Sequence, residues 1–409
     1  MWREWTFHQP AESEFFDVAM NRIVIDGDLV KKADEVLVDF RGKAAEVVLS
    51  CPQSADSQAE GAEVRDHLRL MLQTVFAVLD EKLHVGDIEE LRRLKGFKGE
   101  LDEIEEIIKE KVASLEVFIL AHDLGKPEVV IFNARDDSSK HHDSLSVAWQ
   151  HGDRADSIKK YQKIFRDFAK KNSDLSAQEI HHQFFIENQI SINYHSYAKQ
   201  IAHPDRREIL NKLAAEHRLT PEDAEDIFHA ILLHEHALDS FGREANVAIY
   251  NYLMDYCTKH GRDADDFLDL FLAIMFIESC ASPRFGVKGI YFDLSAVINF
   301  LTAEREFAPW KNEERLKRRK DKKLKIERVH LRAAGLDGDS LMKLLGMKPS
   351  PAFGGLLAQI HAFARGEGFL PALPVKISEE ICRRVDRLPP PQAPSPGAGR
   401  GSEDRVGLV

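Results

Sequence analysis

Cysteine is scarce in this 409-residue chain. Its four cysteines lie far apart and include no Cys-x-x-Cys pair, so the sequence excludes both a disulfide framework and a zinc-thiolate site. We therefore expect reduced thiols and a cytoplasmic protein. The four residues are Cys51, Cys257, Cys280 and Cys382.

Long apolar runs are absent as well. No stretch approaches the roughly 20 residues that a membrane-spanning helix needs. The first residues, MWREWTFHQPAESEFF, lack the basic start and apolar stretch of a signal peptide. We expect a protein that is neither secreted nor embedded in a membrane.

An excess of positive charge is also missing, since the formal net charge is -12. This balance excludes a protein that wraps nucleic acid over its whole surface. Basic residues do concentrate in one segment, KNEERLKRRKDKKLKIER, residues 311–328. We expect any RNA contact to involve that segment. The sequence does not determine the oligomeric state.

Strand-like alternation is scarce, whereas helical spacing is common. From about residue 62, apolar residues recur at intervals of three and four, as in VRDHLRLMLQTVFAVLDEKL. The stretch TPEDAEDIFHAILLHEHALDSF also carries a helix start, with Thr220 as N-cap, Pro221 at the first position and Asp223 three residues after the cap. These patterns predict a mainly α fold.

Composition divides the chain into four regions, with one large domain and appendages. Residues 1–60 are mixed and contain one strand-like run, NRIVIDG. Residues 61–305 are expected to form the helical domain, and 306–388 a basic linker and a small helical subdomain. The tail, 389–409, is rich in Pro, Gly and Ser, so we expect it to be disordered.

A His-Asp pair follows the apolar run in VFILAHDLGKP. Neighbouring side chains on a helix point about 100° apart, so His122 and Asp123 can share one ion only at a helix end or across a shared crevice. The following Leu-Gly-Lys-Pro ends it. A divalent ion that activates water needs several such ligands on rigid elements. The alternative is that His122 makes a hydrogen bond within the core and Asp123 caps a nearby group.

Further potential metal ligands occur elsewhere in the chain. His67 on an amphipathic helix, AHDLGKP 55 residues later, and further helical histidines with a late acid resemble the HD superfamily of metal-dependent phosphohydrolases. The resemblance implies an HD-type helical bundle in which His67, His122 and Asp123 bind a divalent metal (Mn, Mg, Ni, Co, Fe or Zn). It also implies that Lys126 lies beside a phosphate.

The third and fourth histidines of that family correspond best to His195 and His234. They would bind phosphate oxygens, carry a second metal or protonate the leaving oxygen. His142, in KHHDSLS, is the alternative to His195. With His195 chosen, residues 128 to about 190 form an insertion in the helical domain.

The last acidic ligand departs from the family pattern, which has Asp in a small-residue helix. Here MFIESCAS offers Glu278, and Asp239 in HEHALD is the alternative. The extra methylene of glutamate displaces its oxygens and can change the coordination geometry or the preferred metal.

A second resemblance lies in GLDGDSLMKLLGMKPSPAFGGLLAQIHAFARGEGF, residues 335–369. This stretch is similar to the tail motif of bacterial tRNA nucleotidyltransferases, the CCA-adding and poly(A) polymerase family. It predicts a short helix, a Pro-fixed turn and a second helix capped by the turn. Residues 1–60 contain no nucleotide-binding turn with strand-borne aspartates, so we expect no nucleotidyltransferase head and no nucleotide addition.

Together, the two resemblances predict a metal-dependent phosphohydrolase, a phosphodiesterase or phosphatase. It would hydrolyse a phosphoester of a nucleotide or an RNA end with a metal-activated water. The second hypothesis is a non-catalytic RNA-, tRNA- or nucleotide-binding module derived from a tRNA nucleotidyltransferase. The basic segment 311–328 favours that second hypothesis.

Overall fold

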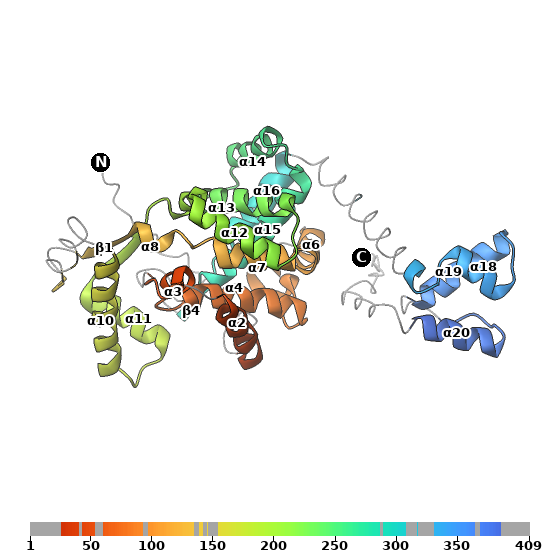
Figure 1. Cartoon of the computed structure of the whole chain (residues 1–409), viewed down its shortest axis with the longest axis horizontal. Helices are drawn as coiled ribbons and strands as arrows, with labels where there is room; N and C mark the ends of the chain where they lie inside the picture. Colours follow the sequence, from red (N-terminus) through yellow and green to blue (C-terminus); the bar gives the residue numbers. More distant parts are fainter. Residues whose placement is uncertain are drawn as a thin grey trace, which may run out of the picture. The chain divides into compact units, whose positions relative to one another are not determined.

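The fold is taken from a computed structural model, in which the described residues form two units divided after residue 309. Figure 1 shows helices throughout both units, so the predicted mainly α fold is confirmed. No helix in the described part of the chain has both the length and the apolar character to cross a membrane. The described residues are 26–40, 43–53, 60–92, 97–134, 139–141, 145, 154–286, 289–307, 317, 331–364 and 369–385.

The described part of the N-terminal region is helical. Helix α2 (Gly27–Asp39) begins after Asp26, whose carboxylate accepts hydrogen bonds from two backbone N–H groups of the first turn. It is followed by α3 (Lys43–Leu49), and both helices contact the next long helix. Most of the strand-like run at residues 21–27 lies outside the described residues, as do the tail 389–409 and, apart from residue 317, the basic segment 311–328.

A bundle of helices forms the body of the larger unit. Its centre is α15, whose side chains from residue 267 onward are almost all buried because apolar residues surround the helix. It contacts six other helices of the bundle, α4, α6, α7, α13, α14 and α16. Thr220 caps α13 in a capping box with Asp223, as predicted. The elements are α4 (Val64–Leu79), η1 (Val85–Asp87), α5 (Glu89–Arg92), α6 (Lys98–Glu110), α7 (Val112–Ala121), η2 (Tyr197–Ala202), α12 (Pro204–Glu216), α13 (Pro221–Phe241), α14 (Val247–Lys259), α15 (Ala264–Ala281) and α16 (Ser295–Phe307).

A smaller layer of the same unit lies where the insertion was expected. Strand β1 pairs with β2 in antiparallel register, from Val130 opposite Tyr194 to Ala134 opposite Ile190. The strands bring the two ends of the expected insertion together, and helices α10 and α11 pack against them in a separate apolar cluster. The elements are α8 (Lys126–Val129), β1 (Val130–Ala134), α10 (Arg154–Lys171), α11 (Ala177–Asn188) and β2 (Ile190–Tyr194). A second two-stranded sheet comprises β3 (Arg284–Gly286) and β4 (Gly289–Tyr291).

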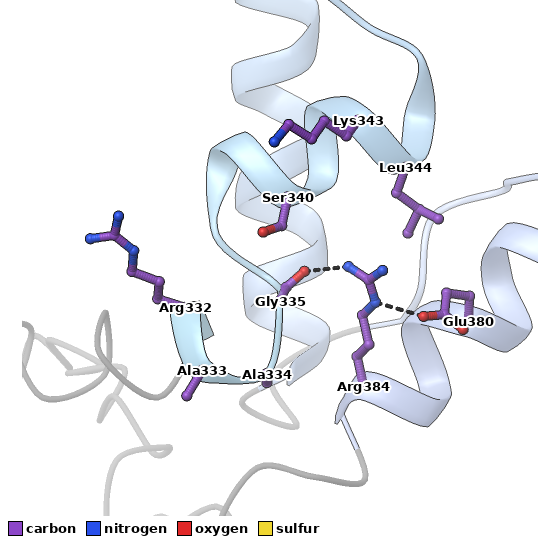
Figure 2. A pocket seen from close by; sticks show the side chains of 9 residues that line it. All are labelled: Arg332, Ala333, Ala334, Gly335, Ser340, Lys343, Leu344, Glu380 and Arg384. Carbon is purple, nitrogen blue, oxygen red and sulfur yellow. Dashed lines mark hydrogen bonds and ion pairs between the residues drawn. The ribbon is translucent and has the colours of Figure 1, made fainter.

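The smaller unit contains α18 (Gly338–Leu345), α19 (Pro351–Ala364) and α20 (Val375–Val385) around its own apolar core. Helix α18 ends at Gly346, whose φ of 63° suits glycine. The hydroxyl of Ser350 then accepts a hydrogen bond from the first turn of α19, so the predicted helix, turn and capped second helix are present. Figure 2 shows Arg384 joining α20 to the turn before α18 through the carbonyl of Gly335, beside an open hollow of about 540 Å³.

Candidate metal centre

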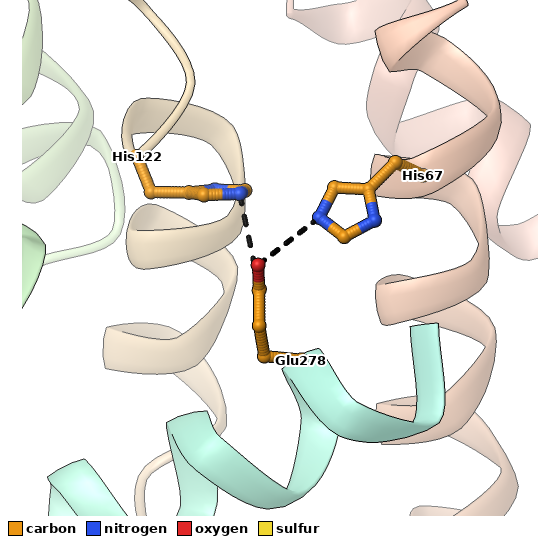
Figure 3. A group of neighbouring side chains, drawn as sticks. All are labelled: His67, His122 and Glu278. Atoms are coloured by element: carbon orange, nitrogen blue, oxygen red, sulfur yellow. Dashed lines mark ion pairs between the residues drawn. The ribbon is translucent and has the colours of Figure 1, made fainter. Parts of the chain in front are cut away.

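Three helices of the larger unit each contribute one side chain to a buried cluster (Figure 3). His67 comes from α4, His122 from the end of α7 and Glu278 from α15, and one potential ligand atom of each lies within 4.8 Å of the others. The Nε2 atom of His67 is 3.4 Å from Oε1 of Glu278, and Nε2 of His122 is 3.9 Å from Oε2. None of the three residues is more than 8% exposed.

The end of α7 explains how neighbouring residues reach one site. The helix ends at Ala121, and the N–H of His122 donates the last helical hydrogen bond, to Phe118. Asp123 is already in the turn that follows, so its side chain is freed from the helical direction and can lie beside the histidine. The prediction that HDLGKP ends the helix is confirmed.

Backbone carbonyls orient both histidine rings. The Nδ1 atom of His67 lies 3.2 Å from the oxygen of Ala281, and that of His122 lies 3.0 Å from the oxygen of Ile119. A carbonyl oxygen only accepts, so each Nδ1 carries the hydrogen and each Nε2 is directed toward Glu278. The hydrogen bond from Nδ1 to a backbone carbonyl is a common way in which proteins hold a metal-binding histidine in the tautomer that leaves Nε2 for the metal.

Several polar atoms in the cluster have no hydrogen bond within the described part of the chain. They include Nε2 of His67 and of His122, Oε2 of Glu278 and Oδ1 of Asp123. Buried polar atoms without partners are costly, and these are lone-pair donors close to one another. The residues present therefore fit a divalent cation with nitrogen and oxygen ligands.

The charges of the cluster are strongly coupled. Burial by itself lowers the pKa of His67, but the negative charges of Glu278 and Glu60 outweigh it and raise that pKa to about 9. Burial raises the pKa of Glu278, yet His67 and His122 hold it well below its usual range. The pKa of His122 is lowered by burial. Without an ion, the centre thus presents a carboxylate between the imidazolium of His67 and the imidazole of His122, and a bound ion would displace the proton from Nε2 of His67.

Asp123 and Lys126 form a polar pair next to the three ligands. Oδ1 of Asp123 is 3.4 Å from Nε2 of His122, and Oδ2 is 2.8 Å from Nζ of Lys126. The ammonium group lies 5.1 Å from the ring centre of Tyr194 and 5.2 Å from that of Tyr197, within range for cation–π attraction. Burial opposes both charges, but attraction to His122 and Lys126 lowers the pKa of Asp123, and attraction to Asp123 raises that of Lys126. Asp123 therefore offers one oxygen to the cluster and one to the lysine.

His234 on α13 lies at the edge of the cluster, with its ring centre 5.6 Å from that of His122. Its Nδ1–H donates to the carbonyl of Ile231 over 2.7 Å, so its Nε2 accepts the hydrogen bond of 3.0 Å from the hydroxyl of Tyr197. Burial lowers the pKa of His234 to about 4. The ring is therefore neutral and held at both nitrogens.

Residue 125 is a glycine at a place where the structure leaves no room for a side chain. A Cβ atom there would collide with the carbonyl oxygen of Tyr197 and with the side chain of Gln200, both on η2. The missing side chain lets η2 pack directly on the turn that carries Asp123 and Lys126. The HDLGKP stretch thus positions the tyrosine as well as the His-Asp pair.

The remaining candidates are placed differently. His195 is exposed in the turn after β2, near enough to Glu235 of α13 for its charge to lower that carboxyl's pKa against the larger raising effect of burial. Asp239 is exposed and pairs with Arg243 over 2.7 Å. Of the two acids left open by the sequence, Glu278 is the one beside the histidines. His142 lies outside the described residues.

Two neighbours of the site were not anticipated. Glu60 is buried with Oε1 3.6 Å from Nδ1 of His67, and burial raises its pKa to about 7. Tyr197 follows His195 by two residues and lies against His234 and Lys126. The sequence holds no signal for Glu60. Tyr197 and His195 both belong to the stretch NYHSYAK. Because η2 begins at Tyr197, the tyrosine is directed at the site, whereas His195 in the preceding turn stays exposed.

Comparison with models of protein families, with curated proteins and with solved structures found no match for this chain. The resemblances to the HD superfamily and to tRNA nucleotidyltransferases therefore rest on the motifs themselves.

Proposed function

We propose that this chain is a metal-dependent phosphohydrolase that cleaves a phosphoester of a nucleotide or an RNA end. The observation that supports it best is the convergence of His67, His122 and Glu278, whose lone pairs lie within 4.8 Å of one another with both histidines held by carbonyls. Asp123 and Lys126 beside them supply a further oxygen ligand and a positive charge for phosphate.

The roles of the side chains follow from their places. His67, His122 and Glu278 would hold the ion, and Oδ1 of Asp123 would supply a further ligand. The ion, when bound, lowers the pKa of a water molecule and polarises the phosphate. Lys126, which lies over the rings of Tyr194 and Tyr197, would neutralise phosphate charge, and its pair with Asp123 keeps the ammonium group beside the cluster.

Positive charge at the site continues toward the surface. Lys126 and Lys199 lower the pKa of Glu235 against the larger raising effect of burial, and both Lys199 and the nearby His195 are exposed. An anionic substrate would approach from this side, along η2. Because the ligands themselves are more than nine-tenths buried, a narrow terminal phosphate suits the centre better than an internal phosphodiester.

The test compares two acids that the sequence could not separate. Glu278→Gln removes the charge between the histidines, and the matched control Asp239→Asn removes an exposed carboxylate on α13. We expect bound metal, measured by elemental analysis, and metal-dependent hydrolysis to fall by at least about tenfold in Glu278→Gln, since loss of a ligand costs at least as much as loss of its outer partners. The control should match the wild type.

Hydrolysis is measured with an aryl phosphodiester, an aryl phosphomonoester and a panel of nucleotides, each with Mn²⁺, Mg²⁺, Ni²⁺, Co²⁺, Fe²⁺ and Zn²⁺. His122→Ala with Asp123→Ala provides an independent loss of the centre. Absence of bound metal in the wild type, or equal rates in wild type and both variants, would refute the proposal.

One observation favours the second hypothesis, a non-catalytic binding module. The nearly complete burial of His67, His122 and Glu278 also suits an ion that only holds α4, α7 and α15 together. In that case the wild type binds metal but cleaves none of the substrates. RNA binding would then be retained, and loss of metal would lower the unfolding temperature.

A further inference from the structure

Helix α10 is strongly basic in an acidic protein. It carries seven lysines and arginines against two aspartates, whereas the whole chain has a formal net charge of -12. Four of the cations recur at intervals of four, three and four residues, and each of them is exposed. We call these four residues the α10 row: Lys159, Lys163, Arg166 and Lys170.

Helical geometry turns this spacing into a straight line of charge. At about 100° and 1.5 Å per residue, the α10 row lies within an arc of about 60° and extends about 16 Å along the helix. The opposite side of α10 buries Ile158, Tyr161 and Phe168 in the cluster shared with β1, β2 and α11. Because that apolar side is fixed against the protein, the α10 row faces away from it.

The row belongs to the same unit as the candidate metal centre. Gln162 of α10 donates a hydrogen bond of 2.7 Å to the carbonyl of Ser50, and α10 also contacts α8, which begins at Lys126. Figure 1 shows α10 beside α11, below β1. The row is therefore a rigidly held feature of the larger unit.

Little in the described part of the chain compensates this charge. Lys163 and Lys170 form no ion pair with another described residue. Lys159 lies 4.0 Å from Asp156 with both side chains largely exposed, a pair that stabilises little. Arg166 donates a hydrogen bond to the carbonyl of Gln162 in its own helix, and its charge acts on Glu63, where it lowers the carboxyl pKa against the larger raising effect of burial. Like charges in such a line repel one another, and an external polyanion would relieve that repulsion.

A hollow adjoins the α10 row. It has a volume of about 370 Å³ and is lined by His141, Lys160, Lys163, Ile164 and Asp167. An imidazole and an apolar side chain next to cations are the surfaces on which an unpaired base can rest while its phosphates meet lysine. This combination of a charged line and a small hollow suits a nucleic acid strand.

We propose that the α10 row is a docking surface for the backbone of single-stranded nucleic acid, with a base in the adjoining hollow. The axial steps of about 4.5 and 6 Å let each member meet a different phosphate of a strand that lies along the helix. A membrane is disfavoured because amphipathic helices bind bilayers through an apolar face, and that of α10 is packed inside the protein. A protein partner is disfavoured because lysine is depleted in protein interfaces.

The proposal is tested with the full-length protein and a fluorescein-labelled oligouridylate, by fluorescence anisotropy over a range of salt concentrations. The row variant is Lys159→Gln/Lys163→Gln/Arg166→Gln/Lys170→Gln. The control, Lys31→Gln/Lys212→Gln/Arg243→Gln/Lys259→Gln, removes the same number of exposed lysines and arginines from other parts of the larger unit. Circular dichroism establishes that both variants fold.

We expect the row variant to bind at least about tenfold more weakly at low salt, and its log–log salt slope to be flatter by about 3, since each phosphate contact on a single strand contributes about 0.7. The control should bind like the wild type. Equal binding by row variant and wild type, or an equal loss in the control, would overturn the proposal. So would row-dependent binding to vesicles of phosphatidylcholine and phosphatidylserine without binding to the oligonucleotide. The result does not depend on hydrolysis by the metal centre.

Discussion

Buried histidines in this chain differ in what their second ring nitrogen meets. In His67 and His122 one nitrogen is held by a carbonyl and the other is directed at Glu278. In His229 one nitrogen is 2.6 Å from the hydroxyl of Tyr256, and the other is 3.8 Å from Glu225. In the first arrangement Nε2 of each ring can bind an ion once it is deprotonated, whereas in the second both nitrogens already have contacts within the protein.

His229 predicts a pH dependence of stability that is separate from the metal centre. Burial and the nearby His260 lower its pKa to about 4, below the value near 6.5 of the unfolded chain. Between these values the unfolded state binds more protons, so the free energy of unfolding falls as pH decreases from 6.5 toward 4. We expect His229→Asn, which can keep the Tyr256 contact, to reduce this loss by on the order of 1 kcal/mol between pH 7 and 5.

Urea unfolding at several pH values measures the effect. His236→Asn is the matched control, because His236 is an exposed residue on the same helix. An unchanged pH slope in His229→Asn would contradict the assignment.

At the scale of elements, the site depends on how closely η2 approaches the turn after α7. Tyr197 reaches both His234 and Lys126 only because Gly125 leaves room for the η2 backbone. The paired strands β1 and β2 connect these two segments, since β1 follows α8 and β2 precedes η2. Gly125 and the pairing of β1 with β2 therefore both determine how η2 lies against the turn after α7.

Gly125→Ala should displace η2 and destabilise the protein by about 1–3 kcal/mol, the usual cost of a forced overlap in a packed interior. Urea unfolding and bound metal are the measurements, and both should decrease. Gly99→Ala in α6 is the control, because a Cβ there meets nothing within 4 Å. Alanine should stabilise that helix by up to about 1 kcal/mol. Similar effects of the two substitutions would show that contact with η2 is unimportant.

At the scale of the whole molecule, the two units have separate apolar cores among the described residues. The larger core includes residues from 29 to 303, and that of the smaller unit runs from Leu331 to Ile381. The ligands of the candidate centre all come from the larger unit. Metal binding should therefore belong to that unit alone.

A chain that ends at residue 309 tests this division. We expect it to keep the bound metal and the urea midpoint of the full-length protein, because it retains the whole of the larger core. Loss of metal from the shortened chain would show that residues after 309 stabilise the centre.

Local sequence determined much of the helical architecture. Apolar spacing predicted the long helices, Thr220 marked the start of α13, and HDLGKP marked the end of α7. These features could be predicted because helix hydrogen bonds and caps join residues only a few positions apart. His67, His122 and Glu278 were predicted as potential ligands through the resemblance to the HD superfamily, because the local pattern around each of them also suits a packed core residue.

Only the tertiary structure decided which side chains meet. It placed Glu278 with the histidines and left Asp239 at the surface, and it turned Tyr197 inward while His195 remained exposed. These outcomes depend on how helices far apart in the sequence pack side by side. Packing is set by the combined shapes of many side chains, and the spacing of residues along one helix does not specify it.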